Sequence, residues 1–398
     1  MLYCLLLNSC NKYIKDIVMY DAVRDFSRRI LTGLLVHEAR IENRYRNYKK
    51  VRPLIQQKSI STPEVKDMEF WQDAQYLQQE VYTLPDIYSI TINNVVYCSR
   101  NHLLMTDFPR RVIENSVPTD VPHNYTVLED MYFRETEKIS GICTIFQAFP
   151  NDYYHRIIDN LPRLYHLHQP EYREIEEIKV VCSDLTEIEE FFLPKLLPEN
   201  AKLFLVDRKK NYLIENLIYP SFLTKINAAY LPAEYLNFFS QRVCPQLSRT
   251  GSKRIYISRS KARMRRLTNE EELLEALERY NFQQYFLEEM TIEEQIDLFS
   301  EAEIVLGPHG AGFANVLFSK NVHIIELFPS QFIWMPVYYF LAKSMQHHYH
   351  YLCSGKELTY TNFDRLLSEK ELSPHSYFKD RDFIVNVTEV VSLLDSII

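Results

Sequence analysis

The run GPHGAG at residues 307–312 joins an apolar segment to a second apolar segment. Only seven glycines occur in 398 residues and three lie in this run, so its backbone needs unusual freedom. A strand before the run and a helix after it would place free N–H groups at the carboxyl edge of a sheet. The run therefore predicts an anion site, and the alternative is a tight strand–helix turn that uses glycine for packing alone.

A second segment, Lys253–Arg266, concentrates positive charge. Seven of its fourteen residues are Lys or Arg, in a chain whose net charge is −8. It begins on a predicted strand and ends in a loop at the sheet edge that also carries the glycine-rich run. Arginine forks bind phosphate through two bonds, so the two elements together favour a nucleotide diphosphate. A solvated basic loop is the alternative, and the acidic chain disfavours general nucleic-acid binding.

A third segment, Asn151–Leu164, is predicted to be helical. His155 and Asp159 lie four residues apart in it, and so share one face. An imidazole beside a carboxylate can remove a proton from a hydroxyl, although an ordinary His–Asp contact has the same spacing. Glu326, on a predicted strand, is expected either to accept hydrogen bonds from ribose or to face solvent. No HExxH motif occurs, and we expect no metal site.

The elements that would position these segments alternate along the second half of the chain. Strands are predicted at residues 254–258, 284–287, 303–306 and 323–328, and helices at 269–280, 291–302 and 312–318. This order implies a parallel sheet. Upstream, the pattern predicts a hairpin within 87–98 that turns at Asn93-Asn94, a helix at 151–168, strands at 178–182, 201–206 and 217–219, and a helix at 232–246. The tail, 383–398, reads as a strand and an amphipathic helix.

A chain of this length suggests two domains. We expect an α/β fold with a helical N-terminal extension over 1–80, an α/β acceptor-side domain over 81–248 and a Rossmann-like nucleotide-sugar domain over 249–398. The segment at 248–253 is the expected linker, and the last helix could pack back on the N-terminal domain.

Seven widely spaced cysteines without a CxxC pair favour a reducing compartment. No apolar run approaches the ~18 residues of a membrane span, and the N-terminus lacks a convincing signal peptide. The chain therefore reads as cytoplasmic, with peripheral contact at the inner face of a membrane left open. The Arg-rich segment 20–48 could serve such contact, or contact with a second copy, or could simply be a packed helical arm.

Three stretches in this order resemble glycosyltransferase family 61. They are YYHRIIDNLPRL at 153–164, RIYISR at 254–259, and EEQIDLFSEAEIVLGPHGAGFANVLF followed by VHIIELFP. The resemblance covers roughly residues 125–330. Bacterial members of the family are often labelled capsular or exopolysaccharide biosynthesis proteins. The resemblance implies a GT-B architecture of two Rossmann-like domains that face a cleft. It also implies inverting, metal-independent sugar transfer, without a cofactor, from a nucleotide-diphosphate donor to a glycan, a lipid-linked glycan or another hydroxyl acceptor.

The family motifs also suggest site residues. The HxxxD motif matches His155 and Asp159, either of which could be the base. The expected acceptor-side residues are Asn151 and Arg163. The expected diphosphate ligands are Arg254, Arg259, His309, Gly310, Ala311, Gly312 and Asn315. Two departures are Arg156, where many bacterial members carry Trp, and Phe313, where Leu is usual; the first puts the acceptor contacts in doubt.

Other functions remain to be weighed against transfer. A dehydrogenase needs a GxGxxG turn, whereas the spacing here is GxxGxG. A catalytically inactive scaffold of the same fold would bind glycan or nucleotide without turnover. A regulatory nucleic-acid binder would show salt-sensitive binding that nucleotide diphosphates do not displace.

Overall fold

The computed structural model describes most of the chain from residue 87 onward. The described ranges are 87–113, 116, 125–148, 152–223, 231–245, 251–329, 337–353 and 381–398, with the short strands β1 (Glu38–Ala39), β2 (Ser59–Ser61) and β3 (Val81–Thr83). The predicted N-terminal extension, apart from β1 and β2, lies outside the described residues. So do residues 248–250 of the predicted linker, and Asn151.

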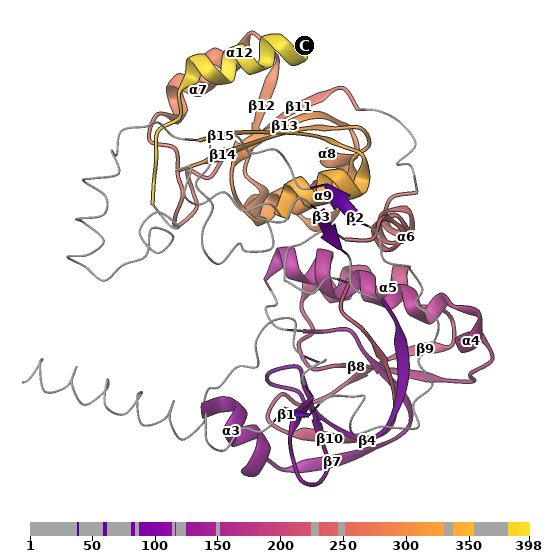
Figure 1. Ribbon diagram of the computed structural model, residues 1–398. Helices are drawn as coiled ribbons and strands as arrows, with labels where there is room; N and C mark the ends of the chain where they lie inside the picture. Colours follow the sequence, from indigo (N-terminus) through magenta and orange to yellow (C-terminus); the bar gives the residue numbers. More distant parts are fainter. Residues whose placement is uncertain are drawn as a thin grey trace, which may run out of the picture.

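The second half of the chain forms a five-stranded sheet in the order β12-β11-β13-β14-β15 (Figure 1). The strands are β11 (Lys253–Ile257), β12 (Phe282–Tyr285), β13 (Ala302–Pro308), β14 (His323–Phe328) and β15 (His348–Cys353). All four pairings are parallel, which confirms the predicted parallel sheet. The sequence had not predicted β15.

Helices cover both faces of this sheet. The helices are α7 (Glu270–Glu278), α8 (Ile292–Ser300), the 3-10 helix η6 (Ala311–Phe318), α9 (Val337–Met345) and α12 (Val387–Ile397). Alternate strand residues serve the two faces: Tyr256 and Leu306 pack with α7 and α12, whereas Ile257 and Val305 pack with α8, η6 and α9. Strands buried on both faces read as the continuous apolar runs seen in the sequence.

The first half of the chain forms an eight-stranded mixed sheet in the order β1-β6-β5-β4-β10-β7-β8-β9. Its other strands are β4 (Ser89–Cys98), β5 (Leu103–Thr106), β6 (Val112–Ile113), β7 (Thr136–Ile145), β8 (Ile178–Cys182), β9 (Ala201–Leu205) and β10 (Asn211–Pro220). Strands β10, β7, β8 and β9 run parallel, and β4 joins β10 antiparallel. Helix α3 (Tyr125–Tyr132) packs on β4–β6.

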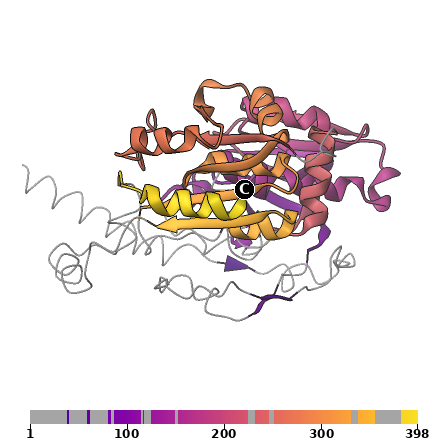
Figure 2. The same ribbon diagram turned by 90° about the horizontal axis from the view of Figure 1, so that it is seen from above.

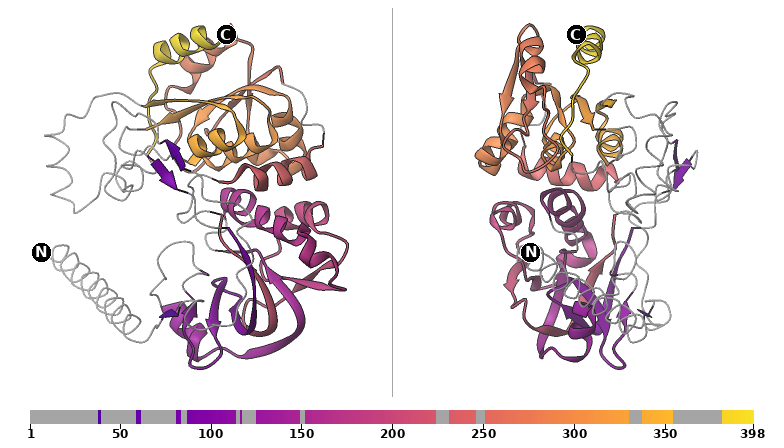
Figure 3. Two further views of the ribbon diagram at one scale, coloured as in Figure 1. Left: turned by 45° about the vertical axis from the view of Figure 1, so that its right-hand side comes forward. Right: turned by 90° about the vertical axis from the view of Figure 1, so that its left-hand side faces the viewer.

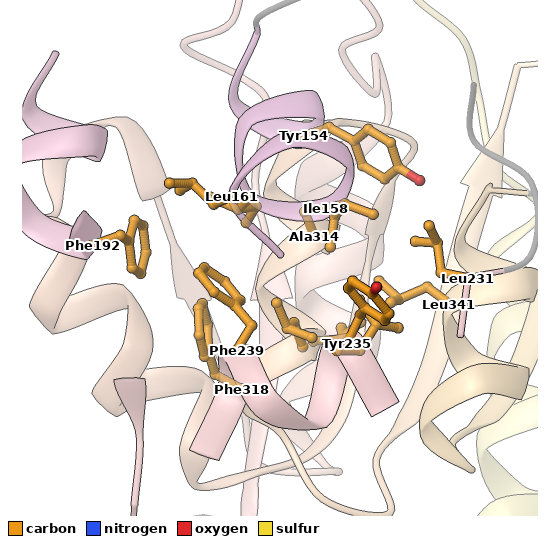
Figure 4. Packing of buried hydrophobic residues seen from close by; sticks show 14 of the residues in the cluster. Tyr154, Ile158, Leu161, Phe192, Leu231, Tyr235, Phe239, Ala314, Phe318 and Leu341 are labelled. Carbon is orange, nitrogen blue, oxygen red and sulfur yellow. The ribbon is translucent and has the colours of Figure 1, made fainter. Parts of the chain in front are cut away.

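A helical layer lies between the two sheets, as both views of Figure 3 show. It contains a π-helical turn η3 (His155–Asn160), the 3-10 helix η4 (Leu161–His168), the short α4 (Pro170–Arg173), α5 (Glu187–Leu196) and α6 (Ala233–Val243). Phe192 from α5, Phe239 from α6 and Phe318 from η6 meet there with ring centroids 5.1–6.2 Å apart (Figure 4). One hydrophobic core therefore runs from the first sheet to the second.

Two sequence predictions about the fold are wrong. Residues 89–98 form one continuous strand instead of a hairpin, because β10 pairs with β4 along its whole length. Asn94 is exposed and takes a φ of 52°, a conformation that asparagine tolerates without ending the strand. The last helix, α12, does not pack back on the first half: it lies on α7, as the view from above shows (Figure 2).

No helix within the described ranges is both long and apolar enough to cross a lipid bilayer.

Candidate functional site

The glycine-rich run forms the turn from β13 into η6. At Gly310 an added Cβ would lie 2.3 Å from Arg259 Nη1, so only glycine lets the guanidinium rest on the backbone here. At Gly307 the added carbon would lie 2.7 Å from the carbonyl oxygen of Ile257 in the neighbouring strand. The turn thus needs glycine for two different reasons: close strand packing at Gly307 and direct contact with Arg259 at Gly310.

Three successive backbone N–H groups in this turn have no hydrogen-bond acceptor among the described residues. None of the hydrogen bonds among the described residues uses the N–H of Gly310, Ala311 or Gly312, whereas His309 N–H donates to Leu327. These groups open the eight-residue helix η6. Free N–H groups at the start of a helix favour an anion.

Two arginines come from the loop after β11, and one of them, Arg259, lies against the turn at Gly310. Arg259 donates to the carbonyl of Met264 at 3.1 Å, and in the described part of the chain neither Arg259 nor Arg265 has an ion-pair partner. Burial and the positive charge of Arg265 both lower the pKa of Arg259. The buried Nε of Arg265 has no hydrogen-bond partner, and its φ of 59° is strained for arginine. Two guanidinium groups that lack a carboxylate partner among the described residues favour an anion at this loop.

His309 is held from behind by Glu326. Its Nδ1 donates to Glu326 Oε1, and Tyr349 donates to Glu326 Oε2 at 2.6 Å. The ring of His309 stacks on Phe328 with centroids 5.2 Å apart. Glu326 is fully buried, so its carboxylate is not accessible to a ribose hydroxyl, and the structure gives it the role of orienting His309.

The His–Asp pair lies on η3, across the helical layer. His155 Nδ1 lies 2.5 Å from Asp159 Oδ2, and His155 Nε2 lies 4.0 Å from Asp152 Oδ2. Burial by itself lowers the pKa of His155, but the hydrogen bond and charge of Asp159 outweigh it, and the pKa lies above its ordinary value. Asp159 is more buried than His155, so the imidazole is the more accessible member of the pair.

A row of aromatic rings connects the pair to the glycine-rich turn. His155 contacts Tyr154 edge to face at 5.2 Å, Tyr154 contacts Tyr338 at 5.7 Å, and Tyr338 contacts His309 at 5.7 Å. Tyr338 also donates a hydrogen bond to the carbonyl of Gly310 at 2.7 Å. The imidazole of His155, in the first half, and the glycine-rich turn, in the second half, therefore lie at the two ends of this row of rings.

Several predicted site residues are not brought to this place. Arg254 lies at the amino end of β11, where it pairs with Glu303 and donates to the carbonyl of Tyr280. Asn315 is fully buried and binds Tyr153 at 2.5 Å and Gln295 at 2.8 Å, so it joins the two halves.

Two arginines of the His–Asp segment serve the fold of the first half. Arg163 is 1% exposed and donates to the carbonyls of Phe146 and Pro220, so it cannot touch an acceptor. Arg156 forms a buried cluster with Asp184 at 2.6 Å and Glu189 at 2.5 Å. The arginine that replaces the usual tryptophan thus points into the protein.

Sequence reasoning missed two residues of the site. Arg265 belongs to the basic run that was singled out, but nothing in the run distinguished it from the exposed Arg263 or from Arg266, which pairs with Asp382. Tyr338 lies on α9, far from any motif, and carried no signal. Only the fold brings it to Gly310.

A metal site was not expected, yet the sequence does contain one DxD triplet, at residues 380–382, that the prediction overlooked. Its Asp382 is bound by Arg266 through the backbone N–H at 2.9 Å and the guanidinium at 2.6 Å. Over the described ranges, no cluster of three or more His, Cys, Asp or Glu side chains has the geometry to hold a metal ion. Asp380 itself lies outside them.

Comparison with known proteins gives one family. Residues 153–325 match the model described as Glycosyltransferase 61. The matched segment runs from Tyr153 to Ile325 and so includes the His–Asp pair, the basic loop and the glycine-rich turn, but not Tyr338. No curated protein sequence matches the chain.

Proposed function

We propose an inverting transfer from a nucleotide-diphosphate sugar to a hydroxyl acceptor, without a metal, and the match of residues 153–325 to the model of Glycosyltransferase 61 supports the transfer of a sugar. The observation that carries the proposal is the pair of arginines, Arg259 and Arg265, beside the free N–H groups of the glycine-rich turn. Fixed positive charge of this kind stabilises a departing diphosphate, the part that a metal plays elsewhere.

We propose His155 as the general base, with Asp159 as the residue that orients it. The hydrogen bond to Asp159 occupies Nδ1 and leaves Nε2 to accept a proton. Asp159 has one oxygen bound by His155 and is nearly buried, which favours an orienting role over direct contact with the acceptor.

In the proposed step, the acceptor oxygen attacks the anomeric carbon as its proton passes to Nε2 of His155. The bond between that carbon and the donor's diphosphate breaks, and the electron pair leaves with the nucleotide diphosphate. The negative charge stays on the departing nucleotide diphosphate, and it is stabilised by Arg259, Arg265 and the N–H groups of Gly310–Gly312. A single in-line displacement inverts the anomeric centre. His309, held by Glu326, lines the donor side.

The architecture, the acceptor class and the cellular compartment are proposed from the resemblance to the family. We propose a GT-B-like arrangement, supported by a donor loop on the second sheet and a base from the layer beside the first. The acceptor would be a glycan or a lipid-linked glycan, in capsular, exopolysaccharide or other surface-glycan synthesis. The reaction would take place in the cytoplasm, with peripheral membrane or self-association contacts of the N-terminal arm as a further part of the proposal.

A thermal-shift panel tests the donor class. UDP, GDP, CDP and ADP, each with EDTA present, are compared with the corresponding nucleosides. At least one diphosphate is expected to raise the melting temperature, since a ligand at 100 times its Kd adds about 2.7 kcal/mol to stability. If none of the diphosphates shifts the transition more than its nucleoside does, the donor assignment is wrong. A shift that appears only when Mg²⁺ replaces EDTA would contradict the metal-independent part.

The pH profile of kcat/KM tests the base. Nε2 must be unprotonated to accept a proton, and the neighbouring carboxylates raise the pKa of His155. Activity is therefore expected to be low at acid pH and to rise through a midpoint above ~6.5, the ordinary value for histidine. The Asp159→Asn variant removes the main group that raises this pKa, so any residual activity should show a midpoint at lower pH. A profile that is flat from about pH 5.5 to 8.5 would exclude a histidine base.

A further inference from the structure

Tyr338 is a buried tyrosine whose hydroxyl reaches the anion-binding turn from α9. It is 2% exposed, and burial raises the pKa of its phenol well above the ordinary value, so the hydroxyl keeps its proton and donates. The acceptor is the carbonyl of Gly310, at 2.7 Å. Its ring contacts His309 at 5.7 Å and Phe313 at 5.5 Å, which fixes the hydroxyl relative to the turn.

The peptide group between Gly310 and Ala311 carries a hydrogen-bond acceptor on one side and a donor on the other, and a ligand at the turn meets one of the two. In a planar trans peptide the C=O and the following N–H point in opposite directions. A carbonyl bound to Tyr338 therefore commits the N–H of Ala311 to the opposite side. If this peptide rotated by half a turn, it would present a carbonyl oxygen to the anion in place of an N–H donor.

Gly310 makes such a rotation inexpensive. Its backbone is extended, with φ −178° and ψ 164°, and it has no Cβ to restrict neighbouring conformations. A side chain at this position would meet Arg259 Nη1, and the guanidinium would have to move away from the turn. A turn that uses glycine for contact with arginine thus needs another group to fix its peptide orientation. The carbonyl accepts one further bond, from Phe313 N–H at 3.1 Å.

We propose that Tyr338 is a positioning residue for the donor site: its hydroxyl holds the Gly310–Ala311 peptide with the N–H directed toward the bound diphosphate. This inference rests on the proposed function, since it assumes that a diphosphate occupies the turn. It adds a residue from outside the matched family segment to the donor site. Because α9 also packs on α6 in the layer between the sheets, Tyr338 links that layer to the turn.

The test is Tyr338→Phe, which removes one hydroxyl and keeps the ring. The matched control is Tyr256→Phe: Tyr256 is also fully buried, and its hydroxyl donates at 2.8 Å to Glu270, on the opposite face of the sheet. Binding of inorganic pyrophosphate, UDP, GDP, CDP and ADP, and of the four nucleosides, is measured by calorimetry. Hydrogen exchange of a peptide that spans 308–313 is measured in parallel.

Loss of the hydroxyl is expected to weaken pyrophosphate and nucleotide-diphosphate binding about five- to tenfold, since one of two bonds to the carbonyl is lost. Nucleoside binding should not change, and exchange within 308–313 should become faster. Tyr256→Phe should match the unmodified protein in all of these assays.

The possible failures are distinct. If the unmodified protein binds a diphosphate and Tyr338→Phe binds it equally well, the positioning role is wrong and the donor assignment stands. Equal weakening of diphosphate and nucleoside would also overturn it, because that pattern reports a general disturbance of the fold. If the unmodified protein binds neither pyrophosphate nor any of the four diphosphates, the proposed function and this inference fall together.

Discussion

Asp159→Asn is expected to lower turnover of the nucleotide sugar by roughly 10³- to 10⁴-fold, because asparagine presets the wrong tautomer of the histidine. Asp159 Oδ2 now accepts from His155 Nδ1 at 2.5 Å. An asparagine amide can donate to Nδ1 instead, which moves the remaining proton to Nε2. A protonated Nε2 cannot receive the acceptor's proton. His155→Ala removes the base itself and should cost about 10²- to 10⁴-fold.

Donor binding separates this result from simple loss of structure. The His–Asp pair lies in the helical layer, whereas the proposed diphosphate ligands lie on the loops after β11 and β13. Both variants should therefore keep the diphosphate Kd within about twofold of the parent. A twofold change in Kd is well below the tenfold change that corresponds to ~1.4 kcal/mol. Asp297→Asn and His348→Ala, at exposed positions away from the pair, serve as matched controls and should turn over normally. Near-native turnover by both His155→Ala and Asp159→Asn would refute the assignment of the base.

Most of the second sheet, from β11 to β14, could be predicted because these elements carry local signals, whereas α9 and β15 were not predicted. Strand β14 spans the expected 323–328, and α8 begins with the expected capping box, in which Thr291 and Glu294 bind each other's backbone N–H groups. The first sheet was harder, because its pairing joins segments far apart in the chain. Asn93-Asn94 looks like a turn locally, yet nine residues of β10 pair with β4 on both sides of it and keep the strand extended. The expected domain boundaries at 80 and 248 stay predictions.

For the site, the sequence located the chemical groups but could not tell which face each side chain uses. Arg254 and Arg259 share one basic run, but one lies at the start of β11 and the other follows its end, so only Arg259 reaches the turn. Arg163 and Glu326 are polar residues that the sequence places near the expected site, but the side chain of each forms buried hydrogen bonds within the protein. Burial is decided by packing against elements elsewhere in the chain, and no spacing rule encodes it. Tyr338 shows the converse case, in which a tertiary contact creates a site residue without any local motif.

Arg259→Ala and Arg265→Asn are each expected to weaken nucleotide-diphosphate binding by about 10- to 100-fold, since a hydrogen bond to a charged group contributes ~1.5–3 kcal/mol. Asparagine is chosen at Arg265 because it tolerates the φ of 59° and so removes the charge without moving the loop. The loss should shrink in high salt, where charges at the half-exposed site are screened in the parent as well. The measurement is calorimetry with the diphosphate that gives the largest thermal shift.

For the same two variants, the expected effect on the stability of the unliganded protein is opposite in sign to the effect on diphosphate binding. In the absence of ligand, burial and, after it, the positive charge of Arg265 lower the pKa of Arg259, and no carboxylate in the described residues pairs with either guanidinium group. Removing one charge should therefore leave the unliganded protein at least as stable as the parent, while the ligand-induced rise in melting temperature falls. Arg266→Ala is the matched control, because Arg266 lies in the same loop but is bound to Asp382 and should leave diphosphate binding intact.

If Arg259→Ala and Arg265→Asn instead lost stability and bound the diphosphate as the parent does, the arginines would serve the fold of the loop. The charge for the departing diphosphate would then have to come from elsewhere, and the overlooked DxD triplet at 380–382, with a divalent cation, would be the first place to look.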